Sequence, residues 1–253
     1  MSLQINLETQ WFLQFFLVFS RISSVLASPI FAGPANVPLT VRIIIIAGVS
    51  YLISSTFNSL VQVGNIVDLA FLLVTEVING LFLLLGIISA IYALELAGRL
   101  IDYQGGLSAA SVFNPASKEQ SSIFGTLLLY LFVFFFYSFD IHHQVLILLK
   151  YLFITFPIGH SLLDGGLLAV VTHLSRMAIF GVLISAPICI TLFLIDVVAG
   201  LIAKSMPQIN VYFLLLPVKV FVCLLMFMLT IKNSLLLFDQ INVVMLDFLS
   251  FQL

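Results

Sequence analysis

The stretch that organises this chain is Glu95–Gly125, ELAGRLIDYQGGLSAASVFNPASKEQSSIFG, a polar and glycine-containing segment within an apolar sequence. It holds five charged residues, although the whole chain has only nine Lys/Arg and eleven Asp/Glu. Glu95, Arg99 and Asp102 are spaced i, i+4 and i+7, so a helix would place them on one face. Glu95 precedes Arg99 in the order that favours an ion pair. We refer to residues 95–125 as the polar segment.

The rest of the polar segment predicts a helix end, a loop of small residues and a new helix. Gly105 and Gly106 weaken a helix, because glycine costs about 1 kcal/mol relative to alanine in a helix interior. The ring of Pro115 disfavours helical backbone at Asn114, which predicts a turn. Ser117–Gln120 reads as a capping box that starts the next helix. Such a loop could line a passage or a subunit contact. It could also be an ordinary connection between two membrane helices, which must be joined by polar loops anyway. Spacing alone favours the ordinary connection.

The composition indicates a membrane protein. The chain has 253 residues, 62% hydrophobic and 8% charged, with a mean hydropathy of +1.25, whereas roughly 25% charge is usual in soluble domains. The net charge of −2 and the absence of a Lys/Arg cluster argue against a nucleic-acid partner. Cys189 and Cys223 lie in apolar runs, which predicts buried thiols rather than a disulfide scaffold or a zinc site. We therefore expect no cofactor.

The hydropathy pattern predicts an all-α fold with six or more long helices. Apolar runs of membrane-spanning length, about 20 residues, occur at 10–31, 41–62, 69–94, 121–153, 174–202 and 208–231. A polar break at Asp140 predicts a separate helix over 141–156. From Asn233 onward apolar residues alternate with acids in an amphipathic pattern, which favours a packing helix rather than a span.

Two acidic residues lie deep in apolar runs and need partners. Glu76 and Asp196 are each expected to pair with a cation or a hydroxyl, because ionisable groups inside membrane segments face one another or a cavity. Lys219 is a candidate cation for one of them. The charged residues of the polar segment either pair among themselves or face a pore or a neighbouring subunit.

Asp140, His142 and His143 form a cluster that could suggest a metal or proton site. Adjacent histidines point about 100° apart on a helix, and no third strong ligand lies at zinc spacing. The pattern therefore favours a polar break at a membrane-interface turn, and we expect no metal.

Several motifs resemble one family. AGRLIDYQGGLSAASVFNPAS resembles the signature of the R component of the flagellar type III export gate, the FliR family, whose injectisome counterpart is the T component. Four further stretches match the family. They are the opening Arg and Val-Pro-x-x-Val-Arg pattern at Arg21–Arg42, FPIG at Phe156–Gly159, MPQINVY at Met206–Tyr212 and PVK at Pro217–Lys219. The histidine pair and FPIG look flagellar, whereas ALELAGRLID at Ala93–Asp102 leans to the injectisome branch. We favour the flagellar branch.

The resemblance implies an all-α subunit in two parts. Residues 1–170 would be similar to the P subunit of the gate, and residues 171–253 would form a helical hairpin and tail similar to the Q subunit. With P and Q, such a subunit winds into a closed pore within a basal body of the bacterial inner membrane, and the B-type switch protein packs at its entrance. Exported unfolded proteins would pass through, and inner-membrane lipid would surround the assembly. The implied role is passive and not enzymatic.

The resemblance also assigns roles to residues. The pore plug corresponds to residues 106–122, and its candidate residues are Gly106, Leu107, Ser108, Ala109, Ala110, Ser111, Val112, Phe113, Asn114 and Pro115. The candidate intersubunit or pore charges are Glu76, Glu95, Arg99, Asp102, Asp196 and Lys219.

Two other functions fit less well. A proton-coupled secondary transporter could use Glu76, Glu95, Asp140 or Asp196 as a relay, but such folds commonly show matching repeats with broken helices, and the two halves of this chain do not match. An intramembrane enzyme built on Asp140 and the histidines lacks support, because neither an HExxH motif nor a Ser/Lys dyad spacing is present.

Overall fold

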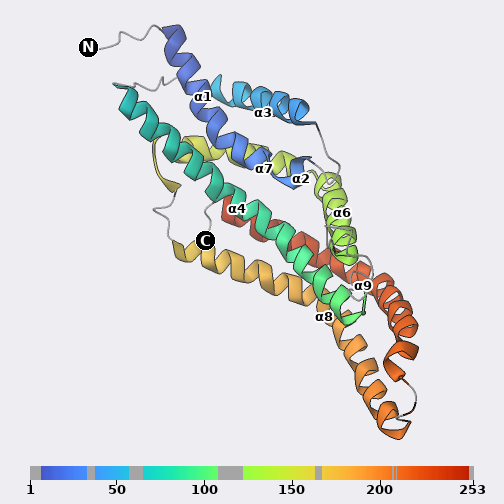
Figure 1. The fold of residues 1–253 in the computed structure, drawn as a ribbon. Coiled ribbons are helices and arrows are strands. Elements are labelled where there is room, and N and C mark those ends of the chain that lie inside the picture. The colour runs from blue at the N-terminus through green and yellow to red at the C-terminus, as the bar shows by residue number, and fades with distance from the viewer. Residues whose placement is uncertain are drawn as a thin grey trace. The chain divides into compact units, whose positions relative to one another are not determined.

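The structure is a computed structural model that describes residues 7–32, 38–56, 65–107, 122–162, 167–206, 208 and 210–250. The described residues form helices joined by turns (Figure 1), which confirms the all-α class. In chain order the helices are α1 (Leu7–Leu26), α2 (Pro29–Ala32), α3 (Leu39–Ser54), α4 (Ile66–Gln104), α6 (Ile123–Ser138), α7 (Ile141–Thr155), α8 (Leu167–Ser205) and α9 (Val211–Ser250).

The expected six long helices are a wrong count for the described part of the chain. Three helices there, α4, α8 and α9, are long and apolar enough to cross a membrane, and α6 with α7 would make a fourth span bent by 70°. The first two apolar runs give only α1 and α3, of 20 and 16 residues. The break at Asp140 and the separate helix after it are confirmed.

The last helix corrects another expectation. The stretch after Asn233 is not a separate element, because α9 runs unbroken to Ser250. Its amphipathic pattern nevertheless correctly identified a packing surface, since Phe238, Ile241 and Leu249 are buried.

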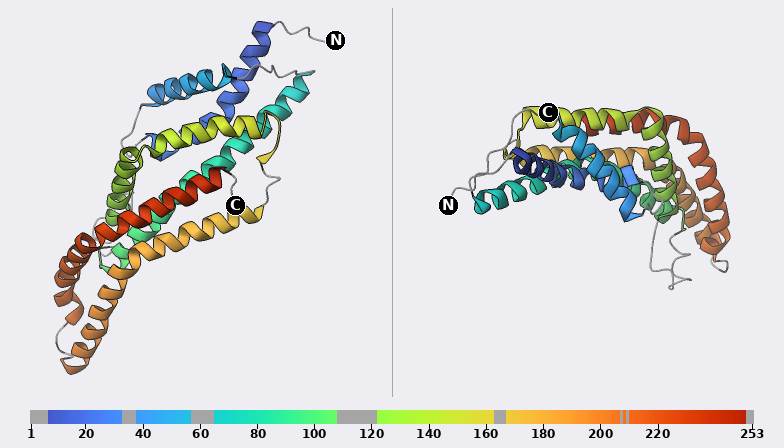
Figure 2. Two further views of the ribbon diagram at one scale, coloured as in Figure 1. Left: turned by 180° about the vertical axis from the view of Figure 1, so that it is seen from behind. Right: turned by 90° about the horizontal axis from the view of Figure 1, so that it is seen from above.

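The chain divides into two compact units, and the first comprises residues Met1–Ser89, Phe136–Leu174 and Val244–Leu253. Helix α1 lies beside α3 (Figures 1 and 2), and their core includes Val18, Ile22, Ile46 and Ile53. Gly80 allows α4 to pass close to α1, because a Cβ there would lie 2.5 Å from the backbone oxygen of Arg21. Glycine at position 80 therefore permits a close approach of the two helices.

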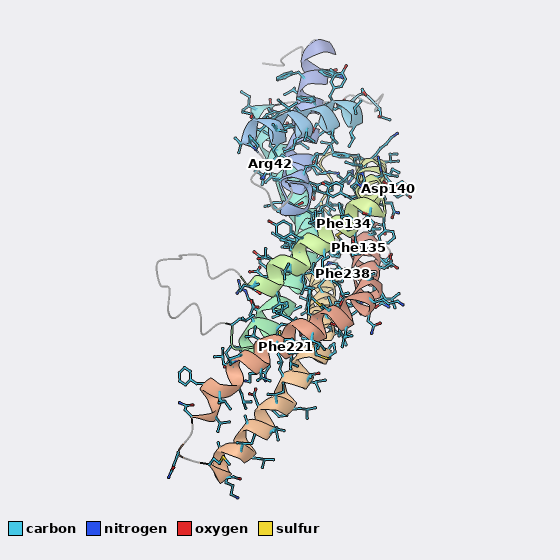
Figure 3. The ribbon with its side chains drawn as sticks, turned by 90° about the vertical axis from the view of Figure 1, so that its right-hand side faces the viewer. Arg42, Phe134, Phe135, Asp140, Phe221 and Phe238 are labelled. Carbon is cyan, nitrogen blue, oxygen red and sulfur yellow. The ribbon has the colours of Figure 1, made fainter. Side chains whose placement is uncertain are left out.

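The second unit comprises Ala90–Phe135 and Ser175–Val243. Within it the later part of α8 and the earlier part of α9 run antiparallel as a hairpin (Figures 1 and 2). Phe132 and Phe135 of α6 pack against Phe238 of α9, with ring centroids 5.9 and 6.1 Å apart; Figure 3 labels the second pair. The thiols of Cys189 and Cys223 are free, the first half-buried and the second buried.

Candidate functional site

The polar segment begins with a well-defined helix end. Gly106 has φ +76°, in the left-handed region that favours glycine. The N–H of Gly106 donates to the carbonyl of Tyr103 at 3.3 Å, and the N–H of Leu107 donates to that of Asp102 at 3.0 Å. These two bonds form a Schellman motif, which satisfies carbonyls left open at the end of a helix. The predicted end of α4 at Gly105 and Gly106 is confirmed.

The side chain of Asp102 holds the start of the next helix. Its Oδ2 accepts the N–H of Ile123 at 2.7 Å, and its Oδ1 accepts the N–H of Phe124 at 3.3 Å. Ser122 Oγ accepts the N–H of Gly125 at 2.8 Å. The first N–H groups of a helix have no partner within the helix, and a carboxylate suits its positive pole. One residue in the last turn of α4 therefore caps α6 and fixes residues 107 and 122 near each other.

Two glycines let these helices meet at their backbones. A Cβ on Gly98 would overlap the backbone of Gly125 and approach that of Phe124. Because neither neighbour can move like a flexible side chain, the contact requires glycine at position 98. Together with the Asp102 contacts it forms the base of the 106–122 loop, which we call the loop clasp: Gly98, Asp102, Ser122 and Gly125.

A polar network links three helices in the same unit. Gln104 Nε2 of α4 donates to Asp196 Oδ2 of α8 at 2.9 Å. The other oxygen of Asp196 pairs with the ammonium group of Lys219 in α9. The Lys219 side chain is 9% exposed and that of Asp196 is 36% exposed. The expected cation for Asp196 is thus Lys219, whereas Gln104, a neutral residue at a helix end, gave no signal in the sequence.

The Glu95 and Arg99 side chains form the expected i, i+4 ion pair, with 2.5 Å between Oε1 and Nη2. The two side chains are 35% and 64% exposed. Asp102 does not join them, because its carboxylate caps α6. The pair lies on the surface of its unit, where exposed ion pairs stabilise a protein by about 0–1 kcal/mol.

Glu76 has a partner in the first unit that the sequence did not reveal. Arg21 donates from Nε to Oε2 at 2.5 Å and from Nη2 to Oε1 at 2.9 Å, and both side chains are 0% exposed. Arg21 Nη1 also donates to the carbonyl of Phe156 at 3.1 Å, and the N–H of Gly159 donates to Glu76 Oε1 at 2.9 Å. This bidentate pair, which we call the buried pair, joins α1, α4 and the turn after α7.

Asn79, one turn after Glu76, binds the same turn. Its Nδ2 donates to the carbonyl of His160 at 2.8 Å, and its Oδ1 accepts the N–H of Leu162 at 2.9 Å. The side chain is fully buried. Sequence reasoning missed it, although an amide three residues after a buried carboxylate falls on the same helical face.

The candidate plug is described only at its ends. Gly106 and Leu107 belong to the helix end above, whereas Ser108–Pro115 and the expected capping box at Ser117–Gln120 lie outside the described residues. Helix α6 begins at Ile123, where Ser122 and Asp102 cap it.

The fold and the site define an all-α membrane protein whose buried polar side chains mainly join one helix to another. Residues 12–243 match the family described as bacterial export proteins, family 1, and the chain belongs to that family.

Relatives come from both branches that the sequence resembled. The chain is 30% identical over 216 residues to the flagellar biosynthetic protein FliR of Bacillus subtilis, covering 84% of this chain and 83% of the relative. It is 26% identical over 213 residues to FliR of Pectobacterium carotovorum, covering 82% of this chain and 80% of the relative. It is 28% identical over 180 residues to Yop proteins translocation protein T of Yersinia pestis, covering 66% of this chain and 68% of the relative.

The chain is therefore a structural component of a type III export apparatus and not an enzyme. Its apolar helices and these relatives indicate an inner-membrane component of a flagellar or injectisome basal body. The transporter and enzyme alternatives are replaced by this assignment.

Proposed function

We propose that this chain forms, with P and Q subunits, a closed pore through which unfolded proteins are exported, and that the 106–122 loop is its plug. The observation that carries the proposal is the loop clasp. Asp102 caps α6 across the loop, so both ends of the loop are anchored at one place. A segment anchored at its base can move without unfolding the helices that carry it. Its small residues suit close packing when the pore is shut.

Unburied apolar helix surface supports assembly with other subunits. In the most apolar 18-residue windows, only 28% of α8 and 11% of α9 is buried within the chain. Surfaces of this kind are covered by lipid or by neighbouring helices. We propose that P and Q subunits cover part of them, that inner-membrane lipid covers the rest, and that the B-type switch protein contacts the assembly at its entrance.

The charged residues divide into two groups in this proposal. Glu76, Asp102, Asp196 and Lys219 have partners inside the chain, so they hold its helices in place. The Glu95–Arg99 pair is partly exposed and is the better candidate for a neighbouring subunit or the pore lumen. We favour the flagellar branch, because FliR of Bacillus subtilis is 30% identical over 84% of the chain, whereas the Yersinia pestis protein is 28% identical over 66%.

Deleting Ser108–Pro115 tests the plug role. The clasp residues are untouched, so the deleted chain should still assemble with P and Q, and cells or vesicles that carry it should leak small ions. A matched variant, with the eight residues replaced by a Gly/Ser sequence of equal length, separates loop length from loop composition. A correctly assembled complex that keeps the membrane tight after the deletion would contradict a sealing role.

A further inference from the structure

The corner between α6 and α7 has an unusual backbone. Asp140 has φ 56° and ψ 24°, the left-handed conformation, and among the described non-glycine residues it is the one with a positive φ. Such a conformation is uncommon outside glycine, although Asp and Asn adopt it more readily than most residues. Asp140 is at the N-cap position of α7, yet its side chain makes no capping hydrogen bond. Its carboxylate is thus directed elsewhere.

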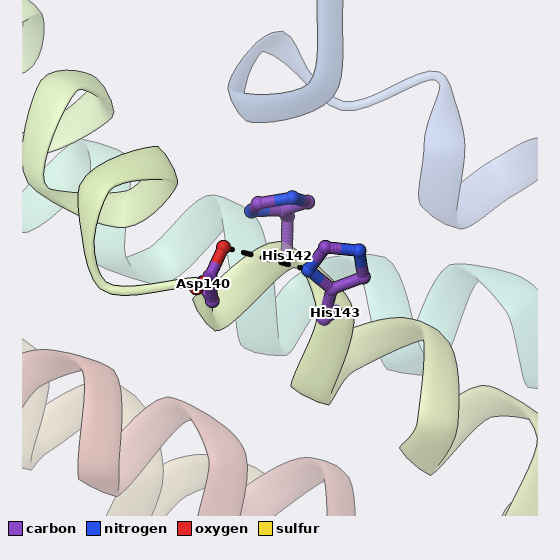
Figure 4. Close-up of side chains that lie close together, drawn as sticks. All are labelled: Asp140, His142 and His143. Atoms are coloured by element: carbon purple, nitrogen blue, oxygen red, sulfur yellow. Dashed lines mark ion pairs between the residues drawn. The ribbon is translucent and has the colours of Figure 1, made fainter.

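The carboxylate faces two imidazole rings. Asp140 Oδ1 lies 3.5 Å from His143 Nδ1, and Figure 4 shows His142 beside this pair. The two histidine rings do not diverge as expected for adjacent helical residues, because their centroids are 4.2 Å apart with planes at 37°. One ligand atom from each of the three residues lies within 4.8 Å of the others.

His142 carries a second observation that points to a ligand. Its ring packs against Tyr137, with centroids 5.0 Å apart, and its Nδ1 is buried without a hydrogen-bond partner in the part of the chain that the structure describes. Buried ring nitrogens normally find a partner. The Tyr137 hydroxyl donates to backbone carbonyls of α2 and makes no hydrogen bond to this nitrogen.

We propose that Asp140, His142 and His143 bind a divalent transition metal ion of the zinc class. Two imidazoles and one carboxylate are ligands that such ions accept. Zinc bonds of about 2.0–2.2 Å place tetrahedral ligand atoms roughly 3.3 Å apart, so modest side-chain rotation completes the site. The Asp140 and His143 side chains are 75% and 67% exposed and can make that movement.

The negative charge of Asp140 and the number of protein ligands favour a cation with an open coordination position. The positive pole of α7 opposes a metal ion, and the carboxylate of Asp140 supplies the negative charge that offsets it. Three protein ligands leave at least one position for water or for a group from another subunit. The bound ion would tie the first turn of α7 to the turn at Asp140. The proposal is independent of the pore proposal, because it uses only these local contacts.

The test uses the full-length chain without a histidine tag, purified in detergent, and Co²⁺ as a spectroscopic probe. The wild-type chain should give visible d–d absorption at one Co²⁺ per chain, and Zn²⁺ should displace it. His142→Gln and His143→Gln should each weaken binding at least tenfold. His160→Gln, which removes an exposed histidine of the same unit, is the matched control and should bind like the wild type.

Asp140→Gly separates binding from folding. Glycine adopts the left-handed conformation freely, so this variant should fold at least as well as the wild type and lose most of its Co²⁺ affinity. The proposal is overturned if the wild type shows no saturable Co²⁺ signal. It is also overturned if Asp140→Gly and the two histidine variants bind as tightly as His160→Gln.

Discussion

Removing one member of the buried pair should destabilise the first unit strongly. Arg21 and Glu76 are both 0% exposed and share two hydrogen bonds. Breaking a buried pair from one side strands a charge and costs about 3–5 kcal/mol. Glu76→Leu also removes the acceptor of the Gly159 N–H, and Arg21→Met removes the hydrogen bond from Arg21 Nη1 to the carbonyl of Phe156. A loss of about 4 kcal/mol changes the ratio of folded to unfolded protein by roughly a thousandfold.

The assay is the unfolding midpoint of purified protein in mixed detergent and SDS micelles, followed by tryptophan fluorescence or protease resistance. Arg21→Met and Glu76→Leu should each lower the free energy of unfolding by about 3–5 kcal/mol. The double variant Arg21→Met/Glu76→Leu should lose less free energy of unfolding than either single variant, because no buried charge remains. Glu95→Gln in the exposed pair is the control and should change the free energy of unfolding by less than about 1 kcal/mol.

Two results would refute this reasoning. Single variants within about 0.5 kcal/mol of the wild type would show that neither charge is stranded when its partner is removed. Single losses that simply add in the double variant would show that the two residues act independently.

Three further predictions concern the second unit. Gly98→Leu should prevent α4 and α6 from packing and abolish recovery of folded protein. The control Gly200→Ala should be tolerated, because a Cβ there meets nothing within 4 Å. Comparable yields of folded protein from the two variants would contradict the close contact at Gly98. Asp102→Asn should weaken the start of α6 by about 1 kcal/mol, seen as faster hydrogen exchange at residues 123 and 124, and unchanged exchange would remove Asp102 as the cap. Lys219→Met should lower the free energy of unfolding less than Arg21→Met, since the Asp196 side chain is 36% exposed and water stabilises its charge. An equal loss of free energy in the two variants would contradict this ranking.

The sequence predicted the partners of charged residues only in part. A carboxylate within an apolar run must find a cation or a hydrogen-bond donor, and on that basis Lys219 was a candidate for either Glu76 or Asp196. The structure pairs it with Asp196. The same rule required a partner for Glu76, but Arg21 lies 55 residues away. One sequence contains no record of which distant helices pack together, so this pairing required the structure.

Helix ends were predicted better than helix lengths. Gly105, Gly106 and the break at Asp140 follow from backbone sterics, which act within a few residues. The length of α9 depends instead on packing of its last turns through Phe238 and Phe248, and hydropathy windows do not register such contacts. The approach of the His142 and His143 rings was missed for a related reason. Their separation depends on side-chain rotamers at the start of α7 and not on helical spacing.

Assembly tests the central claim most directly. The chain would be expressed with and without the P and Q subunits of its own export apparatus, extracted in mild detergent and analysed for mass and composition. We predict that it is recovered as one stable complex with P and Q, and that alone it aggregates or degrades because the apolar surfaces of α8 and α9 lack partners. Recovery of the chain as a homogeneous monomer that binds neither subunit would contradict the account.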